Sequence, residues 1–198
     1  MVEDVSKGEA TRQVVLERAV EVASRLGLAG LTIGSLASEV ELSKSGLFGH
    51  FRSKEALQLQ VLAQARQTFT DQVVHPALAA PRGEPRLRKL FEAWLVMIRE
   101  SASCCLFVSA ATEFDDQPGP VRDQLVRDNK DLMESVAQMF RTGISEGQFQ
   151  LDADPDQFAH ELHGLMLGYF HAHRLMGDSL ADKHTRRAFD RLIDDVRI

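Results

Sequence analysis

The sequence predicts an all-α fold of about nine helices, and three observations support this. Apolar residues recur every three or four positions over most of the 198 residues, without convincing alternation of period two. Prolines, glycines and polar clusters interrupt this periodicity where helices would end. Hydrophobic residues make up 44% of the chain and charged residues 26%, which is typical of a globular protein. We therefore expect helices packed around a sizeable core.

The N-terminal part of the chain predicts three helices. The first covers residues 11–26 and ends before a glycine. Thr32 is a good N-cap for a short second helix, because its hydroxyl can accept a hydrogen bond from a free backbone N–H group. Ser43 caps a third helix, in which Leu47 and Phe51 are the expected core residues.

The rest of the chain predicts six further helices. Ser53 caps a long helix that Pro76 stops near position 74, and a proline-rich loop follows over residues 75–85. Asp154 followed by Pro155 is a typical helix start. The other expected helices cover residues 86–101, 106–114, 121–146, 155–176 and 181–195.

The two short helices within residues 32–51 have the build of a helix-turn-helix, whose second helix lies in the major groove of DNA. Between positions 43 and 54, Lys44, Arg52 and Lys54 stand without any acidic residue, although the chain carries a net charge of −6. A small basic spot on an acidic protein suits docking of one element onto DNA better than coating of a long duplex. The alternative is a surface helical hairpin with incidental charges.

Residues 11–62 resemble the TetR family of bacterial transcriptional regulators, above all in Leu31-Thr-Ile-Gly-Ser-Leu-Ala and Leu42-Ser-Lys-Ser-Gly-Leu-Phe-Gly-His-Phe-Arg-Ser-Lys-Glu-Ala-Leu. The resemblance implies a homodimer that binds a palindromic operator in double-stranded DNA, usually represses transcription, and is released by a small-molecule effector. It implies a helix-turn-helix DNA-binding domain over residues 1–55 and a helical ligand-binding and dimerisation domain over residues 56–198. The positions that match the family's DNA-contacting sites are Thr32, Ser43, Lys44, Ser45, Gly46, His50 and Lys54.

Two residues depart from the family's pattern. Phe48 stands where the family commonly has Tyr, so a hydroxyl that would bind phosphate is missing. Glu41 occupies a turn position that Gly often fills, and Glu tolerates a left-handed backbone less well. Both departures bear on operator affinity. They also keep open a different interpretation, a protein-interaction module that retains the helical fold without DNA binding.

The middle helices hold many Met and aromatic residues, which suits an adaptable apolar cavity. The same residues can simply fill a core, and the cavity interpretation depends on the family resemblance. It predicts a small apolar or aromatic effector. The candidate ligand-binding residues are Trp94, Met97, Phe107, Phe114, Met133, Phe140, Met166 and Phe170.

The penultimate helix carries the candidate dimer interface. Gly164 and Gly168 are four residues apart, which permits close approach of another helix. By resemblance, the last two helices of each subunit form a four-helix interface. The predicted interface residues are His160, Gly164, Leu167, Gly168 and His171.

A metal- or thiol-responsive regulator is the alternative to an apolar effector. It would use Cys104 and Cys105, or imidazoles one helical turn apart, which can share an ion. The histidine spacing lacks the four-residue interval of the zinc-protease motif, and adjacent cysteines favour reduced thiols over a strained disulfide. The four histidines concerned are His160, His163, His171 and His173.

The sequence lacks any nucleophile–base pair, phosphate-binding loop or zinc spacing. We therefore expect a protein that is not an enzyme, with no catalytic residues, no metal and no cofactor. It has no run of about 18 apolar residues and no apolar signal-peptide core at its start, which predicts a cytoplasmic protein without a membrane partner.

Overall fold

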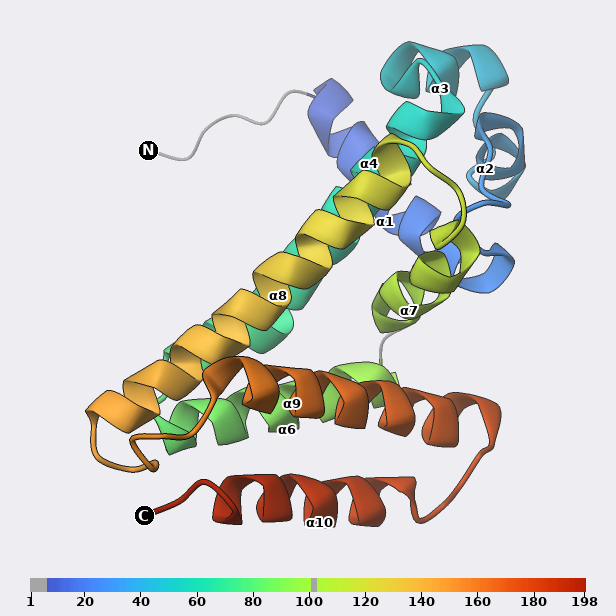
Figure 1. The fold of residues 1–198 in the computed structure, drawn as a ribbon. Coiled ribbons are helices and arrows are strands. Elements are labelled where there is room, and N and C mark those ends of the chain that lie inside the picture. The colour runs from blue at the N-terminus through green and yellow to red at the C-terminus, as the bar shows by residue number, and fades with distance from the viewer. Residues whose placement is uncertain (1–6, 101–102) are drawn as a thin grey trace. The chain divides into compact units, whose positions relative to one another are not determined.

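The computed structural model describes residues 7–100 and 103–198, and its helices fall into two compact units (Figure 1). The first unit holds residues 7–68 and 103–126, and the second holds the other described residues. If helices that continue without a break are counted as one, the described residues form nine helices and no β-strand. The predicted fold class is confirmed.

The first unit contains a three-helix N-terminal module and the helix that packs on it. Helices α2 and α3 contact each other, and α1 lies against α7. Leucines from the loops and short helices, such as Leu28, Leu36 and Leu47, are completely buried in the core of this unit. The helices are α1 (Lys7–Leu26), α2 (Ile33–Glu39), α3 (Lys44–Phe51), most of α4 (Lys54–Phe69), α7 (Ser103–Phe114) and the first turns of α8 (Pro120–Ser145).

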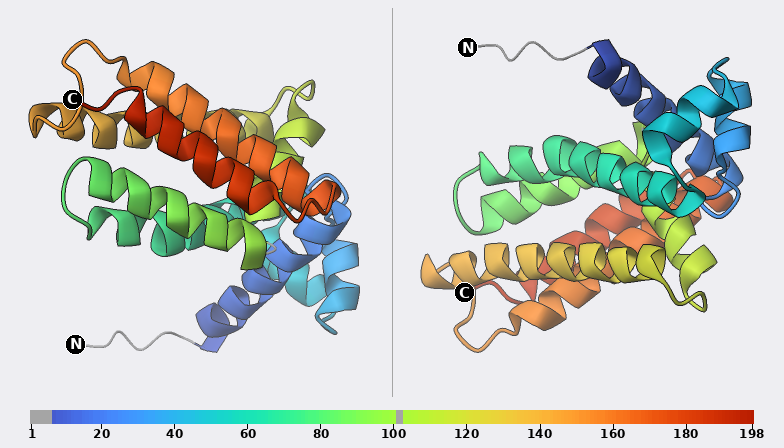
Figure 2. Two further views of the ribbon diagram at one scale, coloured as in Figure 1. Left: turned by 90° about the horizontal axis from the view of Figure 1, so that it is seen from below. Right: turned by 90° about the horizontal axis from the view of Figure 1, so that it is seen from above.

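The second unit is built on helices that lie side by side. Figures 1 and 2 show α9 (Pro155–Phe170) next to α10 (Ala181–Asp194), with α6 (Glu84–Glu100) packed against them. Aromatic rings join these layers: Phe91 of α6 stacks on Phe189 of α10, with the ring centres 4.0 Å apart. The distal turns of α8 complete the core.

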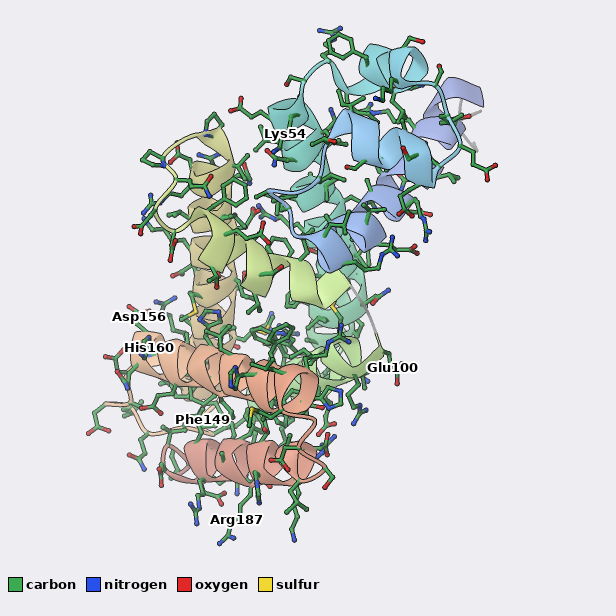
Figure 3. All side chains as sticks on the ribbon, turned by 90° about the vertical axis from the view of Figure 1, so that its right-hand side faces the viewer. Lys54, Glu100, Phe149, Asp156, His160 and Arg187 are labelled. Atoms are coloured by element: carbon green, nitrogen blue, oxygen red, sulfur yellow. The ribbon has the colours of Figure 1, made fainter. Side chains whose placement is uncertain are left out.

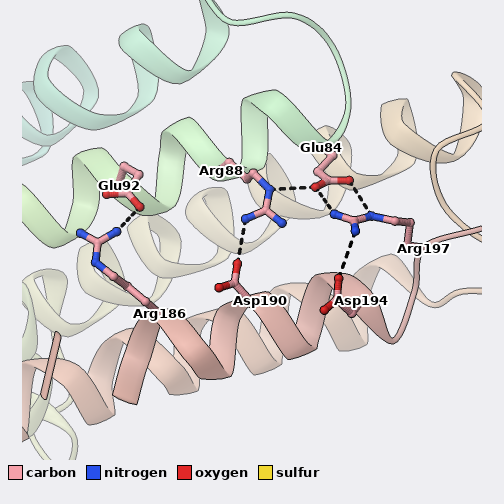
Figure 4. A network of polar contacts seen from close by, with 7 residues as sticks. All are labelled: Glu84, Arg88, Glu92, Arg186, Asp190, Asp194 and Arg197. Carbon is pink, nitrogen blue, oxygen red and sulfur yellow. Dashed lines mark hydrogen bonds and ion pairs between the residues drawn. The ribbon is translucent and has the colours of Figure 1, made fainter. Parts of the chain in front are cut away.

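A network of ion pairs orients α10 on α6 (Figure 4). Arg88 contacts Glu84 at 2.8 Å and Asp190 at 2.9 Å, and Arg197 also bonds to Glu84. Partial burial raises the pKa of Glu84, but the hydrogen bonds from Arg197 and Arg88 outweigh it and hold that pKa below its ordinary value. The largely exposed Arg88–Asp190 pair contributes about 0–1 kcal/mol. The Phe91–Phe189 stack contributes about 0.5–1.5 kcal/mol beyond the area that it buries.

The prediction that Pro76 stops the long fourth helix is wrong. Helix α4 continues through a π-helical segment, η1 (Thr70–Val74), into α5 (His75–Leu78). In η1 the His75 N–H bonds to the carbonyl of Thr70, five residues back. In an α-helix a proline ring clashes with the carbonyl of the residue four positions earlier, and the wider π-helical turn relieves this clash. The helix therefore continues past Pro76. The loop is consequently shorter than residues 75–85.

The other helix ends follow local signals. Asp154 caps α9 by accepting hydrogen bonds from the N–H groups of Asp156 and Gln157, at 2.9 and 3.2 Å. A second π-helical segment, η2 (His171–Leu175), extends α9, and Gly177 follows with a φ of +61°. No helix in the described part of the chain is long and apolar enough to cross a membrane.

The compact units divide the chain differently from the predicted functional domains. The predicted boundary between residues 55 and 56 lies near the start of α4, whereas the first unit continues to residue 68 and includes α7. That boundary concerns function, and it stays a prediction.

Candidate nucleic-acid interface

Two hydroxyl groups define the starts of α2 and α3. The Thr32 hydroxyl accepts a hydrogen bond from the Ser35 N–H, and the Ser35 hydroxyl accepts one from the Thr32 N–H, both at 2.9 Å. This reciprocal pair is a capping box. The Ser43 hydroxyl accepts from the Gly46 N–H at 3.1 Å. Both predicted caps are confirmed, and each contributes about 1 kcal/mol to helix stability.

Helix α3 divides sharply into a buried side and an exposed side. Leu47 and Phe51 anchor it to the core with exposed fractions of 0% and 1%. A methyl group added to Gly49 would meet nothing within 4 Å, so the backbone there is open to close approach. The exposed residues of the helix are Lys44, Ser45, Gly46, Phe48, Gly49 and His50.

The two predicted DNA-contacting lysines lie in different settings. The Lys44 side chain reaches toward α2, with its Cε atom 3.5 Å from the position that a methyl group on Gly34 would occupy. Lys54 lies at the start of α4 (Figure 3). Its Nζ atom donates a hydrogen bond to the Ala29 carbonyl at 2.6 Å. An ammonium group has three N–H donors, so this contact leaves Lys54 able to bind a phosphate as well.

The loop before α2 is held by three side chains, two of which sequence analysis missed. Glu113 of α7 accepts a hydrogen bond from the Ala29 N–H at 2.7 Å, opposite the Lys54 contact on the same residue. Gln58 of α4, only 5% exposed, donates to the Leu28 carbonyl at 2.8 Å. One signal was available: Gln58 is a lone amide on a helix face that is otherwise apolar. The position of α2 therefore depends on α4 and α7.

Two residues that are not glycine adopt a positive φ on either side of α3. Glu41 has a φ of +54°, and Arg52 has a φ of +62° with a ψ of −39°. The Ser53 N–H bonds to the Phe51 carbonyl at 2.7 Å, which makes Arg52 the centre of a γ-turn. Such conformations cost about 1–3 kcal/mol each and often occur at functional sites. Both ends of α3 are thus held by strained turns.

Comparisons with known proteins decide the family. Residues 15–61 match the family model described as bacterial regulatory proteins, tetR family. Residues 83–189, more than half of the chain, match the model described as tetracyclin repressor-like, C-terminal domain. The chain belongs to the TetR family of bacterial transcriptional regulators.

Individual relatives agree with this TetR assignment. The HTH-type transcriptional repressor DhaR of Mycobacterium sp. (strain GP1) is 27% identical over 154 residues, which cover 75% of this chain and 74% of DhaR. A solved protein of Saccharomonospora viridis, described as a transcriptional regulator in complex with choline, is 26% identical with a TM-score of 0.78, covering 97% and 100% of the two chains. A TetR regulator of Chloroflexus aurantiacus shares the fold with a TM-score of 0.85 at 21% identity, covering 97% and 98%. Members of the family are transcription regulators rather than enzymes.

The Glu41 turn provides a stability test for this TetR helix-turn-helix. Glu41→Gly removes backbone strain from the folded state, but it also raises the conformational entropy of the unfolded chain. The net effect is a free energy of unfolding that is higher by about 0.5 kcal/mol in the variant. Thermal unfolding followed by circular dichroism is therefore expected to show a slightly higher midpoint. The matched exposed change Glu17→Gly, inside α1, should lower it instead, because glycine weakens a helix interior. A lower midpoint for Glu41→Gly would show that the turn is not strained.

The predicted ligand-binding residues divide between the two units. Phe107 and Phe114 pack in the core of the first unit. In the second unit, the Trp94 ring lies edge-on to Phe69 at 5.4 Å, and Phe140 stacks between Phe149 and Phe158. The other four members, all in the second unit, are Met97, Met133, Met166 and Phe170. Their role in ligand binding stays a prediction.

The second unit also has an open groove of about 360 Å³. Its apolar lining residues are Val74, Leu78 and Met139, and none of its lining residues belongs to the predicted ligand-binding set. The polar lining residues are Arg86, Glu134, Ser135, Gln138 and Thr142.

Four of the predicted dimer residues share the outer side of α9, and the fifth, His171, is the first residue of η2. All five are exposed, with Leu167 39% exposed and His160 near the start of the helix (Figure 3). A methyl group added to Gly164 or Gly168 would meet nothing within 4 Å. The structure thus describes an open strip of small residues on α9, and its role in dimerisation stays a prediction.

The four histidines differ in their exposure. His163 is half-buried and its ring centre lies 6.4 Å from that of Trp94. Burial lowers the pKa of His163, and the nearby His160 lowers it further. Among the described residues no three His, Cys, Asp or Glu side chains are grouped to hold a metal ion. The side chains of Cys104 and Cys105 lie outside the described part of the structure.

Proposed function

We propose that this TetR-family regulator is a dimeric repressor that binds a palindromic operator and releases it when a small effector binds. One observation carries the proposal: α3 presents an exposed side of polar residues, glycines and one phenylalanine, while Leu47 and Phe51 anchor its other side. That is the arrangement a recognition helix needs to enter a major groove. The relative DhaR, which is named a transcriptional repressor, supports repression as the direction of control.

Each predicted DNA-binding residue has a role that fits its position. Lys44 would contact a base edge or a phosphate, and Ser45 a phosphate. Lys54 stands in the first turn of α4, where free N–H groups favour an anion. Gly46 lets the helix backbone approach the groove. The remaining predicted contacts are Thr32, Ser43 and His50, all exposed on or beside α2 and α3.

Dimerisation would place two copies of α3 in successive major grooves, about 34–36 Å apart. The outer side of α9 is the proposed contact, because Gly164 and Gly168 leave room for a helix of a second subunit. The neighbouring exposed residues of this surface are His160, Leu167 and His171. Leu167 supplies exposed apolar surface that a partner helix would bury.

The dimer proposal predicts that Gly164→Leu separates the subunits. In sedimentation velocity the wild type should run at twice the mass of one 22.1-kDa chain, whereas the variant should run as a monomer because its side chain blocks close helix approach. Loss of the dimer should also weaken operator binding. Ser145→Leu, an exposed small-to-large change on α8, is the control and should leave the dimer intact. A dimeric Gly164→Leu variant would rule out this face.

The proposed effector is a small apolar or aromatic molecule in the second unit. The surplus of Met and aromatic residues there supports this class, and the groove over Met139 is a second candidate location. The neighbour from Saccharomonospora viridis was solved with choline bound, which supports effector binding in a related fold. The effector would release DNA only if it binds more tightly to the conformation whose recognition helices no longer fit the operator. The protein would act in the cytoplasm, where the DNA lies.

A further inference from the structure

Phe48 is the one large apolar side chain that α3 exposes, with 58% of its surface accessible. The other two large apolar residues of the helix are completely buried, so the ring is not needed for the core. A single exposed apolar residue elsewhere on a protein needs no explanation. On a helix that enters the major groove, however, its contacts decide which base pairs are accepted.

Phe48 lies one helical turn after the first residues of α3, on the exposed side of the helix. At about 100° per residue, the surface neighbours of Phe48 one turn back are Lys44 and Ser45. Long side chains on a helix lean toward its N-terminus and cover this patch. In a helix-turn-helix, the N-terminal residues of the second helix contact base edges. Gly49, the next residue along, adds no side chain beside the ring.

We propose that Phe48 selects a thymine by packing against its 5-methyl group, which is a specificity contact within the function proposed above. In the major groove, the base edges present hydrogen-bond donors and acceptors, and the apolar group among them is the 5-methyl group of thymine. The Phe48 ring has no hydroxyl to bond a phosphate or a base edge. Its favourable partner in the groove is therefore this methyl. The contact selects an A·T pair at one position of each half-site.

Removing one methyl group at a time tests this contact. The probe is a DNA duplex of about three helical turns, taken from the genomic fragment that the wild-type protein binds most strongly. Each thymidine of this duplex is replaced in turn by deoxyuridine, which lacks the 5-methyl group. Wild-type binding is expected to weaken about fourfold per half-site at one symmetric pair of positions, because burying a methyl-sized group changes affinity by about that factor. Phe48→Ala should bind the unmodified duplex more weakly and show no further loss with uracil. Phe48→Leu, which keeps an apolar side chain, should retain the sensitivity.

Three other results would overturn the inference. Binding that is indifferent to every uracil means that no methyl is read. A uracil effect of the same size in Phe48→Ala means that another residue reads it. In both cases the wild type still binds DNA and the proposed function stands. A wild type that binds no duplex at all removes the proposed function and the inference together.

Discussion

Replacing Lys44 with Ala is expected to weaken operator binding by about tenfold or more. A charged contact to a base edge or phosphate contributes about 1–3 kcal/mol, and each 1.4 kcal/mol is a factor of ten in affinity. Lys44 is exposed on α3 and helps no core to form, so the variant should fold normally. Fluorescence anisotropy with a labelled operator duplex, at one fixed salt concentration, measures the change.

The salt dependence identifies the group that Lys44 contacts. If it binds a phosphate, the slope of log affinity against log salt should fall by about one in the variant, whereas a base contact changes specificity more than slope. Lys89→Ala removes the same charge from an exposed position on α6 and should leave the affinity unchanged. If Lys44→Ala binds as tightly as the wild type, its assigned role is wrong.

Replacing Gly143 with Ala is expected to destabilise the second unit by about 1–3 kcal/mol, the usual cost of overpacking a core. A methyl group at this position of α8 would lie 2.3 Å from a carbon of the Phe149 ring. Phe149 has no room to move away, since it is completely buried and stacks on Phe140 with the ring centres 4.6 Å apart. The thermal midpoint should fall by roughly 2–12 °C in a chain of this size.

Two further variants isolate this clash. Ser145→Ala, an exposed change two residues along the same helix, should leave the midpoint unchanged. In Gly143→Ala/Phe149→Leu the smaller side chain makes room for the methyl, so the double variant should lose less than the two single changes added together. An unchanged midpoint for Gly143→Ala would mean that this part of the core is loosely packed.

Local chemistry made most helices predictable from sequence. Thr32, Ser43 and Asp154 cap helices through hydrogen bonds to residues two or three positions ahead, so the caps could be recognised in short stretches of sequence. Pro76 was misjudged because its effect depends on the five-residue hydrogen bond of the η1 turn before it. Sequence patterns identify proline as a helix breaker, but they do not predict a π-helical turn.

Contacts between distant residues could not be predicted. Glu113 and Ala29 are 84 residues apart in the chain, and Lys54 and Ala29 are 25 apart. Only the folded first unit brings them together. The DNA-contacting positions were assigned by family resemblance, and the structure adds which of their side chains already have partners in the protein. From the sequence, Phe48 was noted only because it lacks the hydroxyl of a tyrosine. Its exposure on α3 in the structure is the basis for the proposed contact with a thymine methyl.

The central claim, that α3 binds a palindromic operator, is tested most directly by selection of genomic fragments on the purified protein. Fragments retained by the wild type should share a palindrome whose half-site centres are one helical turn, about 10–10.5 base pairs, or a multiple of it apart. Lys44→Ala should retain the same fragments more weakly. Retention of no fragment above background, or of fragments without a shared palindrome, would contradict the account.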